Sequence, residues 1–134
     1  MSFKLKCDFE FIVMSDDCVV CYAKPTWWDR TSCHIDAAAW SLGNRLNMEM
    51  PEHPFTKKYK GVAVRNDGDE VDIELAKEIA RKKAVRAAIG ACKTYIHRAN
   101  DIIQDFYIRS CMQEMAIERK KWTIDEEIEE LAEG

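Results

Sequence analysis

The sequence has no long apolar run. Its most apolar N-terminal stretch, around Phe11 to Met14, is far too short to cross a bilayer. No long apolar region follows the lysines of the N-terminus, so we expect no secretory signal. These absences predict a soluble protein of the cytoplasm that has no membrane among its partners.

Basic residues are missing from the end of the chain. Residues 123–134 hold six acidic and no basic side chains, whereas residues 57–98 hold 11 basic and 6 acidic ones. Such segregation is typical either of solvated helix faces or of a basic patch that takes an anionic ligand. The net charge of −4 and the acidic end count against a polynucleotide as that ligand.

A complete catalytic motif is also missing. Cys33-His34 at the start of a predicted helix is the best nucleophile candidate, because a helix N-terminus lowers a thiol pKa. Adjacent helical residues point about 100° apart, however, so this His cannot reach the thiol, and no Asn or Asp that would orient it is evident. The sequence therefore predicts no catalytic residue, and we expect a protein that is not an enzyme.

The six cysteines predict neither disulfides nor a metal site. Without a secretory signal they are expected to be reduced. Cys18 and Cys21 have the spacing of zinc ligands, but they fall in a predicted strand, where positions three apart point to opposite faces. The acidic residues 67–74 lack the spacing of a calcium loop and suit helix capping instead. We therefore expect no metal and no cofactor.

The N-terminal half alternates like a β-hairpin followed by a helix. Apolar and polar residues alternate from Phe3 to Phe11, and Asp16-Asp17 marks a turn. The partner strand is predicted over Cys18–Lys24, ending at Pro25. A short helix is predicted over Cys33–Leu46, with Thr31 or Ser32 as its N-cap.

A strand-turn-helix signal follows. Lys60–Arg65 alternates as a strand, and Asn66-Asp67-Gly68 supplies a turn that tolerates positive φ. Asp69 or Asp72 can cap the helix that begins at Ile73. The fold class is therefore predicted as α+β: a small antiparallel sheet of about three strands, a short helix and a long C-terminal helical region, in a single domain over residues 1–134.

The C-terminal region carries an apolar seam that steps by 4 and 3 residues, and it is predicted to mediate assembly over residues 85–122. A three-stranded sheet cannot cover so long a stripe, so either the helix breaks at Gly90 or Asn100-Asp101, or a second copy covers it; we favour a homo-oligomer. Thr123–Glu126 forms a capping box that predicts a separate acidic helix over residues 123–134. The seam consists of Val85, Ile89, Cys92, Ile96, Ala99, Ile103 and Phe106.

Seven aromatic and arginine residues are predicted to bind a ligand. Trp27-Trp28 falls in a predicted loop after Pro25, where aromatic rings can stack on bases, and Arg30 supplies a fork for phosphate. The alternatives are that the tryptophans cover the core and that the basic helix is a solvated face. The predicted ligand-binding residues are Trp27, Trp28, Arg30, Tyr59, Arg65, Arg81 and Arg86.

The stretch Lys60–Ala84 resembles a family of small phage and bacterial proteins. In that family a short strand and a Gly precede His/Asn-Pro-x-Asp-Glu-Phe/Val-Asp and a helix reading Glu-Ile-Gly-x-x-Leu/Ile-Ala-x-x-Arg-Ala. Asp67 stands where the family has Pro, and Ala76 where it has Gly. The residues in register are Asn66, Asp69, Glu70, Val71, Asp72, Glu74, Leu75, Ile79, Ala80 and Ala84.

The resemblance implies a functional class. Some small phage proteins of similar build look like sponges for the nucleotide signals of host immunity. We therefore expect a non-catalytic, phage-type anti-defence inhibitor in the host cytoplasm that binds either a small signalling nucleotide or a host immune protein. The alternatives are a nucleic-acid-binding module and a structural assembly protein without a ligand.

Overall fold

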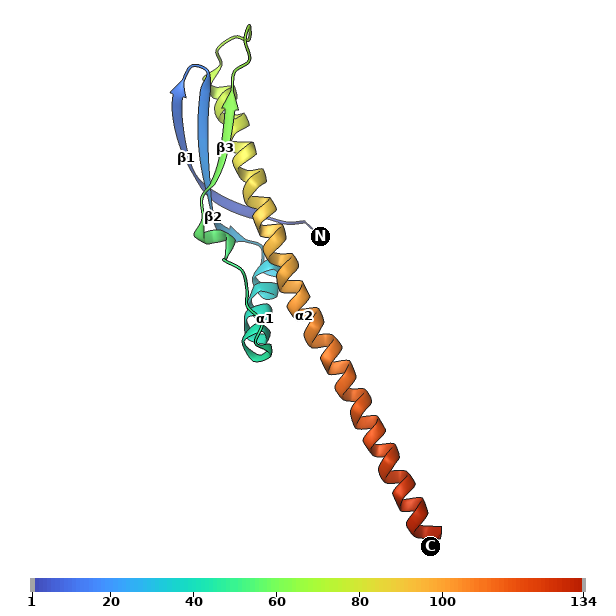
Figure 1. Cartoon of the computed structure of the whole chain (residues 1–134). Helices are drawn as coiled ribbons and strands as arrows, with labels where there is room; N and C mark the ends of the chain where they lie inside the picture. The colour runs from blue at the N-terminus through green and yellow to red at the C-terminus, as the bar shows by residue number, and fades with distance from the viewer. Residues whose placement is uncertain (1, 134) are drawn as a thin grey trace.

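A computed structural model describes residues 2–133 as a compact head and one long helix (Figure 1). Helix α2 runs along the sheet and past α1, and its C-terminal half then projects alone. The α+β prediction is confirmed, while Met1 and Gly134, the ends of the predicted domain, lie outside the described residues. The elements are β1 (Leu5–Ser15), β2 (Cys18–Trp28), α1 (Arg30–Leu46), the 3-10 helix η1 (Pro54–Thr56), β3 (Tyr59–Val64) and α2 (Ile73–Glu133).

The sheet is antiparallel with the strand order β1-β2-β3. The turn predicted at Asp16-Asp17 joins β1 to β2, and pairing runs from Ser15 opposite Cys18 to Leu5 opposite Trp28. The first strand therefore starts later and ends later than the predicted Phe3–Phe11, because the ladder continues down to the turn.

Strand β2 does not end at Pro25, so the prediction of a loop that carries Trp27-Trp28 is wrong. Lys6 pairs with Trp27 and Cys7 with Pro25, which leaves Thr26 as the extra residue of a β-bulge. Such a bulge tolerates a nearby proline and reverses the alternation of side chains between the two faces. Trp28 consequently points into the core, where only 3% of it is exposed, while 41% of Trp27 is exposed.

The N-cap of α1 is Asp29, not the predicted Thr31 or Ser32. Its Oδ1 accepts a hydrogen bond from the amide of Ser32 at 2.9 Å, and its Oδ2 accepts one from the amide of Lys4 at 3.0 Å. These donors, that of Lys4 first, hold the pKa of Asp29 below its usual value. The cap thereby ties the start of α1 to the segment that precedes β1.

The connection from β3 to α2 forms as predicted. Gly68 has a φ of 89°, which lies in the left-handed region that glycine adopts without strain. Asp72 Oδ1 accepts a hydrogen bond from the amide of Leu75 at 3.0 Å, so Asp72 is the cap of α2.

Small residues bring α2 close to the sheet. One buried cluster joins Val19, Cys21, Ala23 and Ala63 of the strands to Ala80 and Ala84 of α2. Gly61 of β3 lies against the backbone of the same turn of α2. A second cluster, formed by Trp28, Cys92 and Tyr95, joins the end of β2 to the middle of α2.

The stripe of α2 that the head buries differs from the predicted seam. Of that seam, the structure buries only Cys92 and Ala99. The contact with the head follows alanines, whose small side chains give little hydrophobic signal but permit close packing. The buried residues of α2 are Ala80, Ala84, Ala88, Cys92, Tyr95, Ala99 and Ile102.

Helix α2 is continuous over 61 residues. The alternative of a break at Gly90 or Asn100-Asp101 is therefore ruled out, and the predicted start of a separate helix at Thr123 is wrong. The Thr123 hydroxyl donates a hydrogen bond to the carbonyl of Arg119 at 3.0 Å, a bond typical of a helix interior. Charged residues interleave with apolar ones throughout, and no helix within residues 2–133 is both long enough and apolar enough to cross a membrane.

Burial of Cys92 predicts that the protein loses stability in alkali. Burial raises the pKa of this thiol from 9.0 to about 11. Because this pKa is higher in the folded state, the contribution of the thiol to stability is fully present below pH 9 and is lost as the pH rises toward 11. We expect the free energy of unfolding to fall by about 1.4 kcal/mol per pH unit for this group across that window. Urea unfolding at pH 8, 9.5 and 11 measures the slope, which Cys92→Ala should flatten and Cys33→Ala, at an exposed thiol, should not.

Candidate functional site

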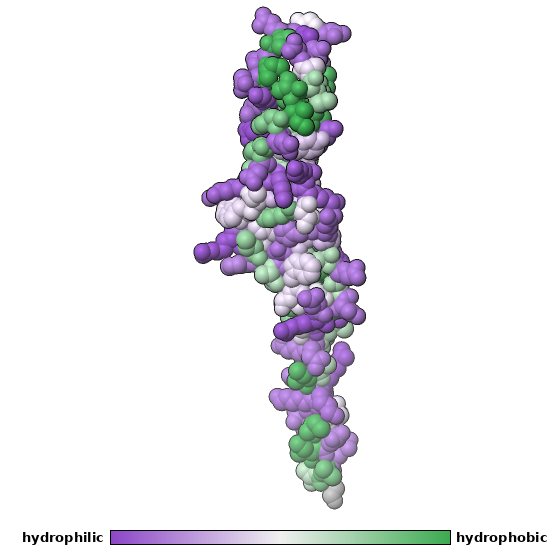
Figure 2. Space-filling model, turned by 90° about the vertical axis from the view of Figure 1, so that its left-hand side faces the viewer, coloured by the Kyte–Doolittle hydropathy of each residue, from purple (hydrophilic) through white to green (hydrophobic). Residues whose placement is uncertain are grey.

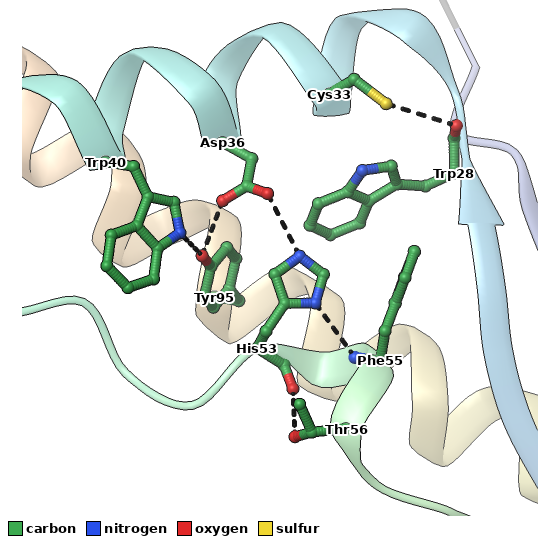
Figure 3. A network of polar contacts seen from close by, with 8 residues as sticks. All are labelled: Trp28, Cys33, Asp36, Trp40, His53, Phe55, Thr56 and Tyr95. Carbon is green, nitrogen blue, oxygen red and sulfur yellow. Dashed lines mark hydrogen bonds and ion pairs between the residues drawn. The ribbon is translucent and has the colours of Figure 1, made fainter.

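A polar network joins α1, the segment before η1, and α2 (Figure 3). Asp36 accepts a hydrogen bond from the Tyr95 hydroxyl at Oδ1, 2.6 Å away, and lies 3.1 Å from His53 Nε2 through Oδ2. The Tyr95 oxygen also accepts a hydrogen bond from Trp40 Nε1 at 2.9 Å. Asp36 and Trp40 share a face of α1 because they are four residues apart. Four side chains from three segments, those of Asp36, Trp40, His53 and Tyr95, are thus joined in one network.

Both ring nitrogens of His53 are occupied within this network. The Phe55 amide donates a hydrogen bond to Nδ1 at 3.2 Å, so Nδ1 is an acceptor, and the ring proton must lie on Nε2, which donates it to Asp36. A catalytic His needs one nitrogen directed at the reacting group. The pair of His53 and Asp36 therefore has the composition of a catalytic dyad, while its contacts are those of a structural link.

The Cys33 thiol has a backbone partner. Its Sγ lies 3.9 Å from the carbonyl oxygen of Trp28, so the nearest acceptor is a peptide oxygen (Figure 3). The structure thus pairs this thiol with a group that cannot remove its proton.

The Tyr95 hydroxyl is the central atom of the network. Burial, and then the hydrogen bond to Asp36, raise the pKa of Tyr95. Tyr95→Phe would leave the Trp40 indole and the Asp36 carboxylate each without one partner, so we expect it to lower the free energy of unfolding by about 1–3 kcal/mol. Tyr107→Phe removes an exposed hydroxyl from the same helix and should change stability by less than about 0.5 kcal/mol. Equal losses in thermal or urea unfolding would contradict the role assigned to Tyr95.

A hollow of about 380 Å³ adjoins the network, and we call it the His53 hollow. Tyr59, a predicted ligand-binding residue, lines it and donates its hydroxyl to the carbonyl of Pro54 at 2.9 Å. Lys57 lies at the same hollow and forms an ion pair with Glu52 at 3.0 Å. The hollow offers aromatic rings to a planar ligand and one paired cation at its edge.

A second hollow, which we call the Arg65 groove, lies between the β1–β2 turn and the start of α2. It measures about 390 Å³, and Arg65, predicted to hold phosphate, lies in it. The Arg65 guanidinium instead contacts Asp17 Oδ1 at 2.7 Å through Nε. Four further carboxylates line the groove, which therefore disfavours an anion: Asp16, Asp69, Glu70 and Asp72.

The other predicted ligand-binding residues are spread over the surface and the core. Trp28 belongs to the core, and Trp27 lies under the amine of Lys6, 4.9 Å from the ring centre. Arg30 is exposed at the start of α1. On α2, Arg81 forms an ion pair with Glu78 at 2.6 Å, and Arg86 is exposed. The structure of a single chain therefore does not bring the seven residues to one site.

Sequence reasoning missed Asp36, His53 and Tyr95. They converge from segments up to 59 residues apart, and the only local signal is the four-residue spacing of Asp36 and Trp40.

For metals, the residues from 2 to 133 contain no group of three or more Cys, His, Asp or Glu side chains placed to hold an ion. Comparison with protein-family models, with curated proteins and with solved structures found no match for this chain.

Proposed function

We propose that this protein acts by binding other proteins, without catalysis, and that several copies assemble through α2 to form the active particle. The observation that supports this is the projecting half of α2, where ten large apolar side chains are exposed along one continuous helix. Exposed apolar surface of this extent is typical of protein interaction sites. The ten residues are Phe106, Tyr107, Ile108, Met112, Met115, Ile117, Trp122, Ile124, Ile128 and Leu131.

These apolar residues form two stripes on opposite sides of the helix. Residues 117, 124 and 131 recur every seven positions on one side, and we call the other side, with Ile108, Met112, Met115 and Trp122, the Met112 stripe. A helix with two apolar sides can contact two neighbours. One stripe suits assembly with further copies, and the other is left for a target protein.

The resemblance to small phage proteins suggests the biological role of this binding, which is to inhibit host immunity by covering an effector protein. The protein-covering form is favoured over nucleotide capture because Trp28 lies in the core and Arg65 and Arg81 have carboxylate partners in their own chain.

Native mass spectrometry of the full chain, purified from cells that produce immune nucleotide signals, tests this proposal. We expect masses at multiples of the chain without a retained small ligand. Ile117→Glu with Ile124→Glu should shift the population toward single chains, because a charge in an apolar interface is costly. A wild-type protein that stays monomeric at tens of micromolar would overturn the assembly step.

Nucleotide sequestration is the second candidate, because Tyr59 lines the His53 hollow beside His53 and Tyr95. Isothermal titration with a panel of cyclic dinucleotides, at low and moderate salt, tests it. Saturable binding that survives moderate salt and is lost in Tyr59→Ala, but not in Tyr22→Ala on the neighbouring strand, would replace the first proposal. Binding only of long single strands, with a steep loss in salt, would favour the nucleic-acid alternative.

A further inference from the structure

Helix α2 carries equal and opposite charges at its two ends. Residues 79–98 hold six basic and no acidic side chains, and residues 123–133 hold six acidic and no basic ones. Along an α-helix each residue adds 1.5 Å, so the centres of the two segments are about 60 Å apart. Because α2 is one unbroken helix, its acidic end cannot fold back onto its own basic segment. If the acidic end binds a basic segment of this kind, that segment therefore belongs to another chain.

An apolar seam connects the two charged segments. Seven positions recur at intervals of seven residues, a period that keeps one line of side chains in contact with a partner helix. At its C-terminal end this seam is open to solvent, with 61% of Ile117 and 82% of Leu131 exposed. The positions, which we call the heptad seam, are Ile89, Ile96, Ile103, Ser110, Ile117, Ile124 and Leu131.

The head has an apolar hollow with basic side chains around it. An apolar hollow of about 570 Å³, which we call the Leu5 hollow, contains the first member of the heptad seam, Ile89. Basic side chains border it: Lys4 and Lys6 line it, and Arg86 and Lys93 are exposed on the adjacent turns of α2. The remaining lining residues are apolar: Phe3, Leu5, Trp27 and Val85. An apolar floor with a basic edge suits an amphipathic acidic helix.

The end of α2 has that character. Ile124, Ile128 and Leu131 occupy one side of the last three turns, and Figure 2 shows apolar side chains gathered near the lower end of the projecting helix. The surrounding positions are acidic: Asp125, Glu126, Glu127, Glu129, Glu130 and Glu133.

We infer that two copies pair through α2 in antiparallel orientation, crossing near Ser110, so that the acidic end of each copy binds the Leu5 hollow of the other. At this crossing Ile103 faces Ile117 of the other copy, Ile96 faces Ile124, and Ile89 faces Leu131, while the small Ser110 lies at the two-fold axis. The arrangement also places Lys93 opposite Glu127. A parallel pair would instead align six acidic residues with six acidic residues, which repel.

This inference rests on the assembly role proposed for α2. Charge-reversal variants of the full chain test the antiparallel geometry separately from assembly itself. Sedimentation equilibrium measures the dimer dissociation constant for a head variant, Arg86→Glu with Lys93→Glu, and for a tail variant, Glu127→Lys with Glu130→Lys. Each should weaken pairing by about tenfold or more, because two reversed charges in each chain then lie beside charges of the same sign in the other chain. The chain that combines all four changes should recover wild-type affinity to within about threefold, since every reversed residue again meets an opposite charge.

Met112→Glu is the matched control, because it introduces a charge into the Met112 stripe and should leave pairing unchanged. Far-UV circular dichroism verifies that each variant keeps its helix. A self-associated chain in which the combined variant does not recover would overturn the antiparallel geometry and leave the proposed function standing. A wild-type chain that is monomeric at tens of micromolar would overturn both.

Discussion

Replacing Trp28 with Ala should lower the free energy of unfolding by about 3–5 kcal/mol, the range for truncating a buried aromatic side chain. Trp28 is 3% exposed, and its ring centre lies 4.9 Å from that of Phe55 and 5.0 Å from that of His53. Its removal would open a cavity between the end of β2 and the middle of α2, where Tyr95 also loses a neighbour. Urea unfolding, followed by circular dichroism, measures the loss.

Trp27→Ala is the matched control, because the residue is adjacent in sequence and identical in type. Trp27 lies on the opposite face of the sheet with 41% of its surface exposed and only Lys6 over its ring, so we expect a change below about 1 kcal/mol. If Trp27→Ala proved the more damaging variant, the bulge at Thr26 would be misplaced. The pair of variants therefore tests which tryptophan the core contains.

The alternation of Val62 and Val64, the turn at Gly68 and the cap at Asp72 were sufficient to predict the strand-turn-helix unit. Each of these signals acts within a few residues: the pleat sets the period, glycine accepts positive φ, and a carboxylate satisfies amides of the first turn. Local patterns therefore identified the order and type of the three strands and two α-helices, but not the ends of β1 and β2 or the 3-10 helix η1.

The sequence did not predict which face of the sheet each tryptophan lies on, because a one-residue bulge reverses the alternation of side chains along the strand. Thr26 carries no feature that marks it as a bulge, yet it reverses which of Trp27 and Trp28 faces the core. Both were predicted as ligand-binding residues, and the structure leaves only Trp27 accessible. The network of Asp36, His53 and Tyr95 could not be predicted from the sequence, because its members meet only after α1 packs on α2.

The sequence left open whether the long C-terminal helical region is one helix or two. Gly90 and Asn100-Asp101 disfavour a helix locally, but one glycine costs only about 1 kcal/mol and the flanking turns are strong helix formers. The alanine stripe that contacts the sheet carries little hydrophobic signal, so the isoleucines beside it were assigned to the same seam. In the structure these are adjacent stripes: the alanine stripe is buried in the head, whereas the isoleucine stripe is only partly covered by it.

Gly61→Ala should destabilise the protein by about 3 kcal/mol or more, as overpacking against rigid backbone does. Gly61 lies in β3, opposite Cys21 of β2, and faces α2. A methyl group added there would collide with the carbonyl oxygen of Ala80 and the amide nitrogen of Ala84. Neither atom can rotate away, so β3 would have to move off the helix and expose the cluster that contains Ala63. Thermal unfolding should show a much lower midpoint.

Gly90→Ala, in the helix α2 that Gly61 faces, is expected to have the opposite effect on stability. A methyl group at Gly90 would meet no atom within 4 Å, and alanine favours a helix interior by about 1 kcal/mol over glycine. The same chemical change should therefore raise stability at Gly90 and lower it at Gly61. If Gly61→Ala unfolded at the wild-type midpoint, α2 and β3 would have to lie farther apart than the structure places them, and the alanines at 80 and 84 would not be the contact that positions the long helix.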